Sequence, residues 1–464
     1  MLNKNQEITL RIKEVNHLGY GVARAEDGQV VFVGGAIDGE LVRAKVIRAE
    51  KNYAVARTEE ILEHSPYREE DFCAVKGCGG CAYRRMTYAR EREIKHQHVI
   101  DCFCAEGLAH IPVEELRFGE KQYAYRNKAQ YPVGQDSDGR VFFGFFAPKS
   151  HRVVEASHCA LQPPAFARIL DTLGRWFTSR KTSVYDEKSH TGLLRHIYLR
   201  QSAEGNVLLT IVINGDWIEG LDGLIGVLND HHPEVVGVWL NLQKKKTNVI
   251  CSDEYVHIWG EKSLTDTLCG VSLSLAPAAF YQVNHEMAAA LYEEARRRAA
   301  LTGNELLLDL YCGVGSIGLS MARDVRELIG IEVVPDAVAC AAENADRNGI
   351  TNASFYVGDA ADAENLLACA EDSRGAKIMP DAVVLDHPRK GCDEKLLSFL
   401  ASRNVPRIIY ISCNPRTLAR DVAILTKMGY EADKVTPFDL FPRTAHVESV
   451  VCLTRRLDNE LPLA

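Results

Sequence analysis

The sequence predicts an α/β protein whose C-terminal part is a doubly wound, mostly parallel sheet. From about residue 284 onward, strand patterns such as LLLDLYC, LIGIEVV and RIIYISC alternate with helical patterns, which is typical of a parallel sheet covered by helices. The first 62 residues instead alternate apolar and polar positions, and the stretch between mixes strand and helix patterns. We therefore expect three domains, at residues 1–62, 63–275 and 276–464.

The N-terminal domain is expected to be a small β-barrel. Its strand patterns are ITLRIKEV, GVARA, QVVFVGGA, ELVRAKVIRA and YAVARTEEIL. Five short strands at this spacing fit an OB-like barrel, a fold in which oligonucleotide binding is common. Arg43, Lys45 and Arg48 give the later strands a basic character, which favours nucleic-acid binding over a purely structural barrel.

The central domain reads as mixed α+β, with a helix expected from Tyr88 to Glu106 and strands in segments such as VFFGFF and VLLTIVI. Basic residues cluster in 84–95 and 126–152. A local basic face on an otherwise acidic chain favours selective RNA binding over indiscriminate binding to polyanions.

Composition excludes several classes of protein. The 464 residues carry 54 Lys and Arg against 63 Asp and Glu, a net charge of −9. Apolar runs fall short of the roughly 18–20 residues that a membrane span needs, and the N-terminus lacks the apolar core of a signal peptide. We expect a cytoplasmic protein, with no membrane partner and with its 14 cysteines mostly reduced.

A cysteine cluster predicts a metal centre at the start of the central domain. Four residues separate its first two cysteines, two separate the next pair, and glycines lie between: Cys73, Cys78 and Cys81, with Gly77, Gly79 and Gly80. This spacing suits structural zinc or an iron–sulfur cluster. By spacing alone, the fourth ligand can be Cys102, Cys104 or Cys159.

A glycine-rich loop predicts a nucleotide-type cofactor. Gly313, Gly315 and Gly318 follow a strand and precede a helix, and Glu332 ends the next strand. Glycines there let the backbone approach a ligand, and the carboxylate can accept hydrogen bonds from ribose hydroxyls. The spacing alone would suggest NAD. However, the D-x-x-C-G-x-G pattern beginning at Asp309 resembles the S-adenosylmethionine loop of class I methyltransferases.

Three further motifs are predicted near the carboxyl ends of the strands, where open α/β sheets bind ligands. They span residues 386–391, 412–415 and 441–448. Cys413, in Ser-Cys-Asn-Pro, is a candidate nucleophile. The alternatives are a buried structural cysteine and an ordinary edge strand at His446-Val447-Glu448.

Together these motifs resemble the RNA uracil-C5 methyltransferase family, whose members form 5-methyluridine. The resemblance covers nearly the whole chain. LGYGVAR and VVFVGGAIDGE resemble a TRAM domain, and the matching segments elsewhere are 73–81, 125–128, 150–152, 157–161, 280–284, 412–415 and 446–448. One departure is His387, where the family usually has Pro, so the local hydrogen bonding of that loop is open.

The resemblance implies roles for individual residues. Cys413 adds to C6 of uracil, which makes C5 nucleophilic toward the methyl group of S-adenosylmethionine, and Glu448 then removes the C5 proton. The implied cofactor-binding residues are Gln282, Tyr311, Glu332, Asp359 and Asp386, and Phe280 stacks on the target base. The implied ligands of a [4Fe–4S] cluster are Cys73, Cys78, Cys81 and Cys159.

Further expectations concern the groups around these residues. Arg416 is a candidate for stabilising the Cys413 thiolate. His446, which is expected to titrate near neutrality, is the alternative base. The uridine must be single-stranded or flipped out of a duplex to be reached.

The favoured function is methylation of a uridine in large-subunit (23S) ribosomal RNA by a monomeric enzyme. A barrel together with a cysteine cluster favours ribosomal RNA, since relatives acting on transfer RNA often lack both. Transfer RNA is the first alternative, and a non-catalytic iron–sulfur RNA-binding protein is another. A cytosine-C5 enzyme fits less well, because Asp386 occupies a loop where such enzymes usually carry a second cysteine.

Overall fold

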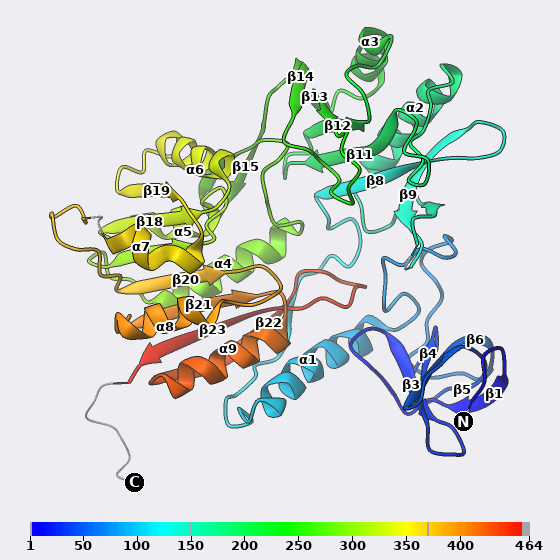
Figure 1. The fold of residues 1–464 in the computed structure, drawn as a ribbon, viewed down its shortest axis with the longest axis horizontal. Coiled ribbons are helices and arrows are strands. Elements are labelled where there is room, and N and C mark those ends of the chain that lie inside the picture. The colour runs from blue at the N-terminus through cyan, green and yellow to red at the C-terminus, as the bar shows by residue number, and fades with distance from the viewer. Residues whose placement is uncertain (1, 149, 369–370, 457–464) are drawn as a thin grey trace.

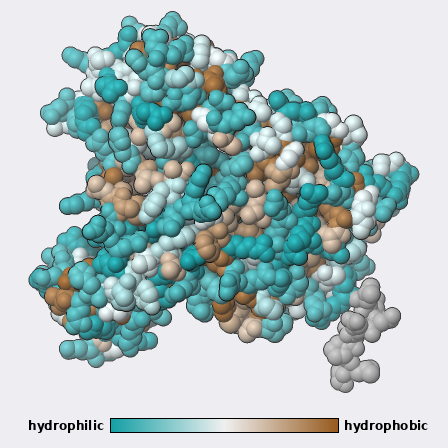
Figure 2. Space-filling view, turned by 180° about the vertical axis from the view of Figure 1, so that it is seen from behind, coloured by the Kyte–Doolittle hydropathy of each residue, from teal (hydrophilic) through white to brown (hydrophobic). Residues whose placement is uncertain are grey.

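The computed structural model describes residues 2–148, 150–368 and 371–456, and these form three large sheets and a hairpin (Figure 1). The α/β class predicted from the sequence is confirmed. The surface seen in Figure 2, on the side opposite Figure 1, is mostly hydrophilic with small scattered hydrophobic areas. Among the described residues, no helix is both long enough and apolar enough to cross a membrane.

The N-terminal sheet has six strands in the order β1-β5-β6-β4-β3-β2. They are β1 (Glu7–Arg11), β2 (Glu14–Val15), β3 (Tyr20–Arg24), β4 (Val30–Gly34), β5 (Leu41–Ala49) and β6 (Tyr53–Glu63). The segment ITLRIKEV, expected as one strand, forms both β1 and β2. The strand is interrupted there because the Ile12 N–H donates to Glu40 O at 2.8 Å, whereas the Lys13 N–H donates to Val22 O at 2.9 Å.

Helix α1 (Tyr88–Ala105) connects this sheet to the rest of the molecule. Thr87 caps its first turn by accepting from the Arg90 N–H, and its buried residues include Val99 and Phe103. These pack into the same core as α9 (Pro415–Lys427), beside which α1 lies in Figure 1.

The central sheet is mixed, in the order β10-β9-β8-β11-β12-β13-β14. Its elements are β8 (Lys128–Gln135), β9 (Val141–Phe146), β10 (Val153–Glu155), α2 (Pro164–Ser179), β11 (Leu194–Gln201), β12 (Val207–Ile213), α3 (Leu221–His231), β13 (Val235–Leu242) and β14 (Tyr255–Gly260). Only β12 and β13 pair in parallel, because α3 carries the chain back between them. Apolar faces of α2 and α3 share one core with the sheet.

The C-terminal sheet has eight strands in the order β19-β18-β17-β20-β21-β23-β22-β7. Its strands are β7 (Arg117–Phe118), β17 (Leu306–Leu310), β18 (Glu327–Glu332), β19 (Ala353–Val357), β20 (Ala382–Asp386), β21 (Arg407–Ser412), β22 (Tyr430–Asp439) and β23 (Glu448–Arg455). Strands β17 to β21 pair in parallel, whereas β23 is antiparallel to both neighbours.

Helices cover both faces of this sheet. One face packs against α4 (His285–Ala299), α5 (Ser316–Met321), α6 (Pro335–Arg347) and the hairpin of β15 (Leu264–Leu268) and β16 (Val271–Leu275); the other packs against α1, α7 (Ala363–Ala368), α8 (Glu394–Ser402) and α9. Short 3-10 turns occupy Ala322–Asp324 and Ala360–Asp362. The chain leaves β17 in one direction to β18 and β19, then returns to β20 on its other side. Such a switch point opens a crevice at the carboxyl ends of the strands.

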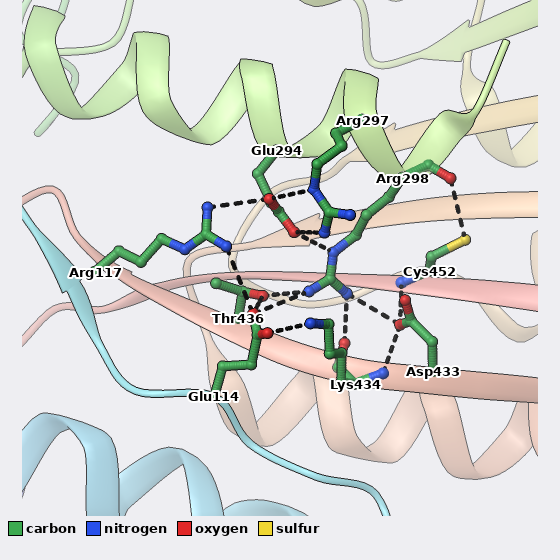
Figure 3. A network of polar contacts seen from close by, with 9 residues as sticks. All are labelled: Glu114, Arg117, Glu294, Arg297, Arg298, Asp433, Lys434, Thr436 and Cys452. Atoms are coloured by element: carbon green, nitrogen blue, oxygen red, sulfur yellow. Dashed lines mark hydrogen bonds and ion pairs between the residues drawn. The ribbon is translucent and has the colours of Figure 1, made fainter.

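An ionic network built around the buried Arg298 and Glu294 fixes β22 and β7 to α4 (Figure 3). The Arg298 side chain, which is 2% exposed, pairs with Glu294 at 2.6 Å and with Asp433 at 3.0 Å. Burial alone would raise the pKa of Glu294, but hydrogen bonds from Arg297 and Arg298 lower it to about 2. The network therefore holds the strand that precedes residues 441–448.

Candidate active site

The parallel strands bring four of the predicted site residues to one edge of the sheet. Tyr311 follows β17, Glu332 ends β18, Asp386 ends β20 and Cys413 follows β21. Because neighbouring parallel strands end at the same edge, these four residues lie together at the carboxyl edge of the sheet, beside the switch point where open α/β sheets bind ligands.

Cys413 lies next to Glu448 across an antiparallel strand pair. Ser412 pairs with Ser449, so the register places Cys413 opposite Glu448, the first residue of β23. Burial raises the pKa of the Cys413 thiol to about 11, and the charges of Glu448 and Asp386 add to the shift. Arg389 opposes it, through its charge and a hydrogen bond.

Three carboxyl groups at this edge of the sheet act on one another: the buried Asp309 and Glu448 and the half-buried Asp386. Burial raises the pKa of Glu448 to about 8 and those of Asp386 and Asp309 to about 7, and the charge of Asp386 raises the other two further. Asp309 accepts from the Gly318 N–H at 2.9 Å through Oδ2. Its buried Oδ1 has no hydrogen-bond partner among the described residues. A cationic ligand would favour ionisation of this group of acids.

The cofactor loop combines unusual backbone geometry with a carboxylate clamp. Tyr311 has φ +65°, which is rare for a residue with a side chain. The Glu332 carboxylate accepts from the Gly313 N–H at 3.1 Å and from the Val334 N–H at 3.0 Å. Glu332 therefore orders both the glycine loop and the turn that begins α6.

Asp359 lies further out on the sheet than the sequence pattern indicated. Strand β19 ends at Val357, so Asp359 stands two residues beyond it, exposed, with Oδ1 accepting from the Ala361 N–H at 2.9 Å. Burial raises the pKa of the Tyr311 phenol, and the charge of Asp359 contributes. The charge of Asp359 therefore acts on Tyr311, at the start of the glycine-rich loop.

The segment before α4 joins the central sheet to the crevice. The Asn127 side-chain amide donates to Gln282 O at 2.9 Å, and Gln282 itself is buried. Phe280 is 62% exposed, and Lys128 Nζ lies 5.7 Å from the centre of its ring. Burial lowers the pKa of Lys128 to about 8, with help from the charges of Arg200 and Arg126. A flat apolar ring beside a cation can receive a base and its phosphate.

Arg389 is a site residue whose role the sequence did not predict. Its guanidinium contacts His446 Nε2 at 3.0 Å, and its carbonyl accepts from Asn414 Nδ2 at 3.0 Å. The sequence offered Arg416 or a loop dipole as the positive partner of the thiol. In the structure Arg389 is the cation that lowers the Cys413 pKa, whereas the charge of Arg416 lowers the pKa values of His17 and His98. The only sequence signal was the position of Arg389 within the motif at 386–391.

The expectation that His446 titrates near neutrality is wrong. Burial lowers its pKa to about 4, and the charges of Arg389, Lys95 and Arg126 lower it further. A neutral imidazole with so low a pKa is a poor base near pH 7. The structure therefore favours Glu448 over His446.

Arg443 anchors the segment that leads to Glu448. It is buried with φ +69°, and its guanidinium donates to Glu69 at 3.0 Å and to Gln122 at 2.7 Å. Its N–H donates to Glu91 at 2.7 Å. These bonds connect residues 441–448 to α1 and to the region just before Cys73.

The four predicted metal ligands line one cavity of about 330 Å³, together with Arg126 and Lys128. The four are Cys73, Cys78, Cys81 and Cys159. Of the other two candidates for the fourth ligand, Cys102 is buried beside His98, whereas Cys104 is exposed on α1. Spacing left this choice open, and the fold places only Cys159 beside the first three.

Sulfur spacing distinguishes this cavity from a compact site for one ion. Among the described residues, no three of the four cysteine sulfurs lie within 4.8 Å of one another. Zinc bound to sulfur at about 2.3 Å would bring tetrahedral ligands to roughly 3.8 Å from each other. The arrangement is therefore wider than a closed zinc site.

Comparisons with known proteins match two family models to this chain, and together they cover most of it. The tRNA (uracil-5-)-methyltransferase model matches residues 109–456, and the TRAM domain model matches residues 2–58. An uncharacterized RNA methyltransferase of Clostridium acetobutylicum is 35% identical over 459 residues, which cover 98% of each chain. Another, of Listeria innocua, is 36% identical over 456 residues, which cover 98% of this chain and 99% of the relative.

A solved structure has the same fold. Pyrococcus abyssi tRNA (uracil-54, C5)-methyltransferase, in complex with S-adenosyl-L-homocysteine, superposes with a TM-score of 0.77. The match covers 96% of this chain and 100% of that one, at 22% identity. At this identity the likeness shows the fold alone.

Proposed function

This chain belongs to the tRNA (uracil-5-)-methyltransferase family, and we propose that it methylates C5 of a uridine in large-subunit (23S) ribosomal RNA. The family establishes an S-adenosylmethionine-dependent RNA methyltransferase. The observation that carries the proposed mechanism is the register that sets Cys413 opposite Glu448. A nucleophile and a base on facing strands can act on adjacent atoms of one ring.

The proposed reaction begins when the Cys413 thiolate forms a bond to C6 of the uracil ring. This addition pushes electron density to C5, which takes the methyl group that S-adenosylmethionine supplies. Glu448 then removes the C5 proton, the C5–C6 double bond re-forms, and the Cys413–C6 bond breaks. Covalent catalysis of this kind divides one difficult step into easier ones.

Electrostatics explains how the two groups become active. Burial keeps Cys413 and Glu448 largely protonated near pH 7 in the free protein. Arg389 favours the charged form of both, and a sulfonium near Asp386 would favour the carboxylate of Glu448 in the same way. We propose that Asp386, Glu332, Tyr311, Gln282 and Asp359 form the methyl-donor site. Two observations fit a ligand with positive charge: the cluster of carboxyl groups that includes Asp386, and the Asp309 oxygen that has no hydrogen-bond partner among the described residues.

RNA is proposed to enter over the surface formed by Phe280, Lys128 and Arg126. The exposed Phe280 ring offers a stacking platform, and Lys128 beside it can meet a phosphate. Because a base inside a duplex is out of reach, the target uridine must be unpaired or flipped. Lys128 and Arg126 also line the cysteine cavity, so this cavity adjoins the proposed RNA path.

We propose that Cys73, Cys78, Cys81 and Cys159 hold a structural [4Fe–4S] cluster. Each thiolate then binds a different iron, so the sulfurs lie farther apart than around one zinc ion. The cavity of about 330 Å³ and the wide spacing of its sulfurs support a multi-atom group. Nothing in the proposed reaction needs electrons, so we assign the cluster a role in holding this region and the RNA.

Transfer RNA is the second candidate substrate, and one observation favours it. The Pyrococcus abyssi enzyme, which is described as acting on uracil 54 of tRNA, covers 96% of this chain. The fold of this chain therefore does not exclude tRNA as the substrate. Ribosomal RNA is preferred on the family resemblance of the TRAM domain and cysteine cluster taken together.

The decisive experiment offers methyl-labelled S-adenosylmethionine with separate transcripts of 23S rRNA, 16S rRNA and tRNA. The proposal predicts label in 23S rRNA as 5-methyluridine, and none with the Cys413→Ala variant. Label confined to tRNA would replace the proposed substrate but keep the reaction. Label in cytosine, or no label in any RNA, would contradict the proposed chemistry.

A further inference from the structure

A second group of metal-ligating atoms lies beneath the active-site loop, away from the four-cysteine cavity. A ring nitrogen of His387, the sulfur of Cys392 and a carboxylate oxygen of Asp421 all lie within 4.8 Å of one another. All three residues are buried. In the part of the chain that the structure describes, no other trio of such ligand atoms is this close.

The hydrogen bonding of His387 leaves one ring nitrogen free for a ligand. Nδ1 lies 2.6 Å from Pro388 O. A carbonyl oxygen only accepts, so Nδ1 carries the proton and Nε2 keeps a lone pair. Nε2 is buried and has no hydrogen-bond partner among the described residues. A histidine that donates one N–H to a backbone carbonyl and offers the other nitrogen has the usual orientation of a metal ligand.

Asp421 supplies a charge at the same place. Its Oδ2 accepts from the Cys392 N–H at 2.8 Å and from the Tyr410 hydroxyl, while its Oδ1 pairs with Arg420 at 2.6 Å. The Arg420 side chain is 43% exposed, so it can turn toward solvent when another cation neutralises Asp421. A thiolate and a carboxylate together then balance a divalent charge.

We propose that His387, Cys392 and Asp421 bind one zinc ion. A thiolate sulfur, an imidazole nitrogen and a carboxylate oxygen are each ligands that zinc binds in proteins. Binding forms a bond from each of the three atoms to the ion, and the Cys392 proton leaves to solvent. No electron transfer is involved.

The position of this site indicates what the ion would do. Asp386 and Arg389 lie on the same loop as His387 and their charges act on the Cys413 thiol, while Asp421 belongs to α9, which begins just after Cys413. A bound ion would pin the loop to that helix and hold Arg389 beside the thiol. His387 also stands where the family resemblance predicts Pro, so the reaction itself does not account for it.

The test is zinc binding by the full-length protein with its iron content measured in parallel. The variants are Cys392→Ser and His387→Gln, with Cys104→Ser as a control for exposed thiols. We expect the wild type and Cys104→Ser to retain one zinc per chain after dialysis. In the two ligand variants zinc affinity should fall roughly 100-fold or more, since even partners of metal ligands contribute 10–100-fold. Iron should be unchanged in all four proteins.

A second measurement keeps the outcome clear if a ligand variant folds poorly. Zinc should raise the thermal unfolding midpoint of the wild type and of Cys104→Ser, because a ligand that binds only the native state stabilises it. Neither ligand variant should respond. Equal zinc affinity in all four proteins would overturn the proposal. A fifth protein, Cys78→Ser, tests the other cavity: zinc that both ligand variants keep and Cys78→Ser loses would place the ion among the four cysteines and would also overturn the proposal.

Discussion

Cys413 and Glu448 face each other where β21 and β23 meet at the carboxyl edge of the C-terminal sheet. The antiparallel register that pairs Ser412 with Ser449 brings them together, and the charge of Glu448 raises the pKa of the thiol beyond the effect of burial. Arg389 acts on both groups in the opposite direction. The proposed nucleophile and the proposed base are therefore electrostatically coupled before any substrate binds.

The reactivity of Cys413 in the free protein should depend steeply on pH. Burial raises its pKa to about 11, and only the thiolate attacks an alkylating reagent. The thiolate fraction therefore rises about tenfold per pH unit below that pKa. Iodoacetamide labelling, read by mass spectrometry of the Cys413 peptide, should rise in this way between pH 7 and 9.5.

Arg389 variants provide the control for that measurement. Arg389→Ala should slow labelling because the pKa of Cys413 rises further, and Arg389→Lys should restore part of the rate. The exposed Cys104 peptide shows that the reagent is active in every sample. If the labelling rate of Cys413 changes neither with pH nor on substitution of Arg389, the proposed influence of Arg389 on the thiol is refuted.

Binding of S-adenosylmethionine near pH 7 should release protons. Burial raises the pKa values of Asp386 and Asp309 to about 7 and that of Glu448 to about 8. A positive sulfonium nearby favours the carboxylates, so their pKa values fall and protons leave. Calorimetry in two buffers of different ionisation enthalpy measures the number released.

S-adenosylhomocysteine is the matched ligand, since its sulfur is uncharged. It should release fewer protons than S-adenosylmethionine, and Asp386→Asn should reduce the difference between the two ligands. Identical proton release for both ligands would show that the carboxyl groups do not face the sulfonium.

Glu332→Ala should weaken binding of S-adenosylmethionine roughly tenfold to a hundredfold, because a hydrogen bond to a charged group contributes about 1.5–3 kcal/mol. Part of this loss reflects the glycine loop, since Glu332 also accepts from the Gly313 N–H. The exposed Asp336, in the first turn of α6, offers a matched control. If Asp336→Asn costs as much affinity as Glu332→Ala, the effect is general electrostatics and not contact with the ribose.

Protein purified without oxygen should be brown and contain about four iron atoms per chain in the four-cysteine cavity. Cys159→Ser should lose the iron, whereas Cys102→Ser should keep it, because Cys102 lies on α1 beside His98. Iron analysis and the visible spectrum distinguish these outcomes. Loss of iron in Cys102→Ser, or zinc in place of iron in the four-cysteine cavity, would refute the proposed cluster.

The sequence predicted those site residues that follow from strand order. Tyr311, Glu332 and Cys413 end up at one edge because parallel strands end together, and an alternating pattern of strands and helices indicates that arrangement in advance. Contacts between side chains from different loops at this edge of the sheet could not be predicted in the same way. The contact between Arg389 and His446 joins segments 57 residues apart, and no periodic pattern encodes a single side-chain contact.

The sequence pattern also did not reveal where a strand is interrupted or which side chains are buried. ITLRIKEV alternates like one strand, yet the pairing of Ile12 with Glu40 divides it. The low pKa of His446 arises from burial and three cations brought in from other segments. Burial depends on packing between remote elements, so residue type alone suggested the ordinary value.

The most direct test of the account is whether Glu448→Gln traps a covalent intermediate. Gln keeps the shape of Glu but is a poor base, so Cys413 can add to C6 and C5 can take the methyl group, while the C5 proton stays and Cys413 is not released. Denaturing electrophoresis with methyl-labelled S-adenosylmethionine should show a labelled protein–RNA adduct, absent in the Cys413→Ala, Glu448→Gln double variant. Normal product release by Glu448→Gln with no adduct, or full turnover by Cys413→Ala, would contradict the central claim.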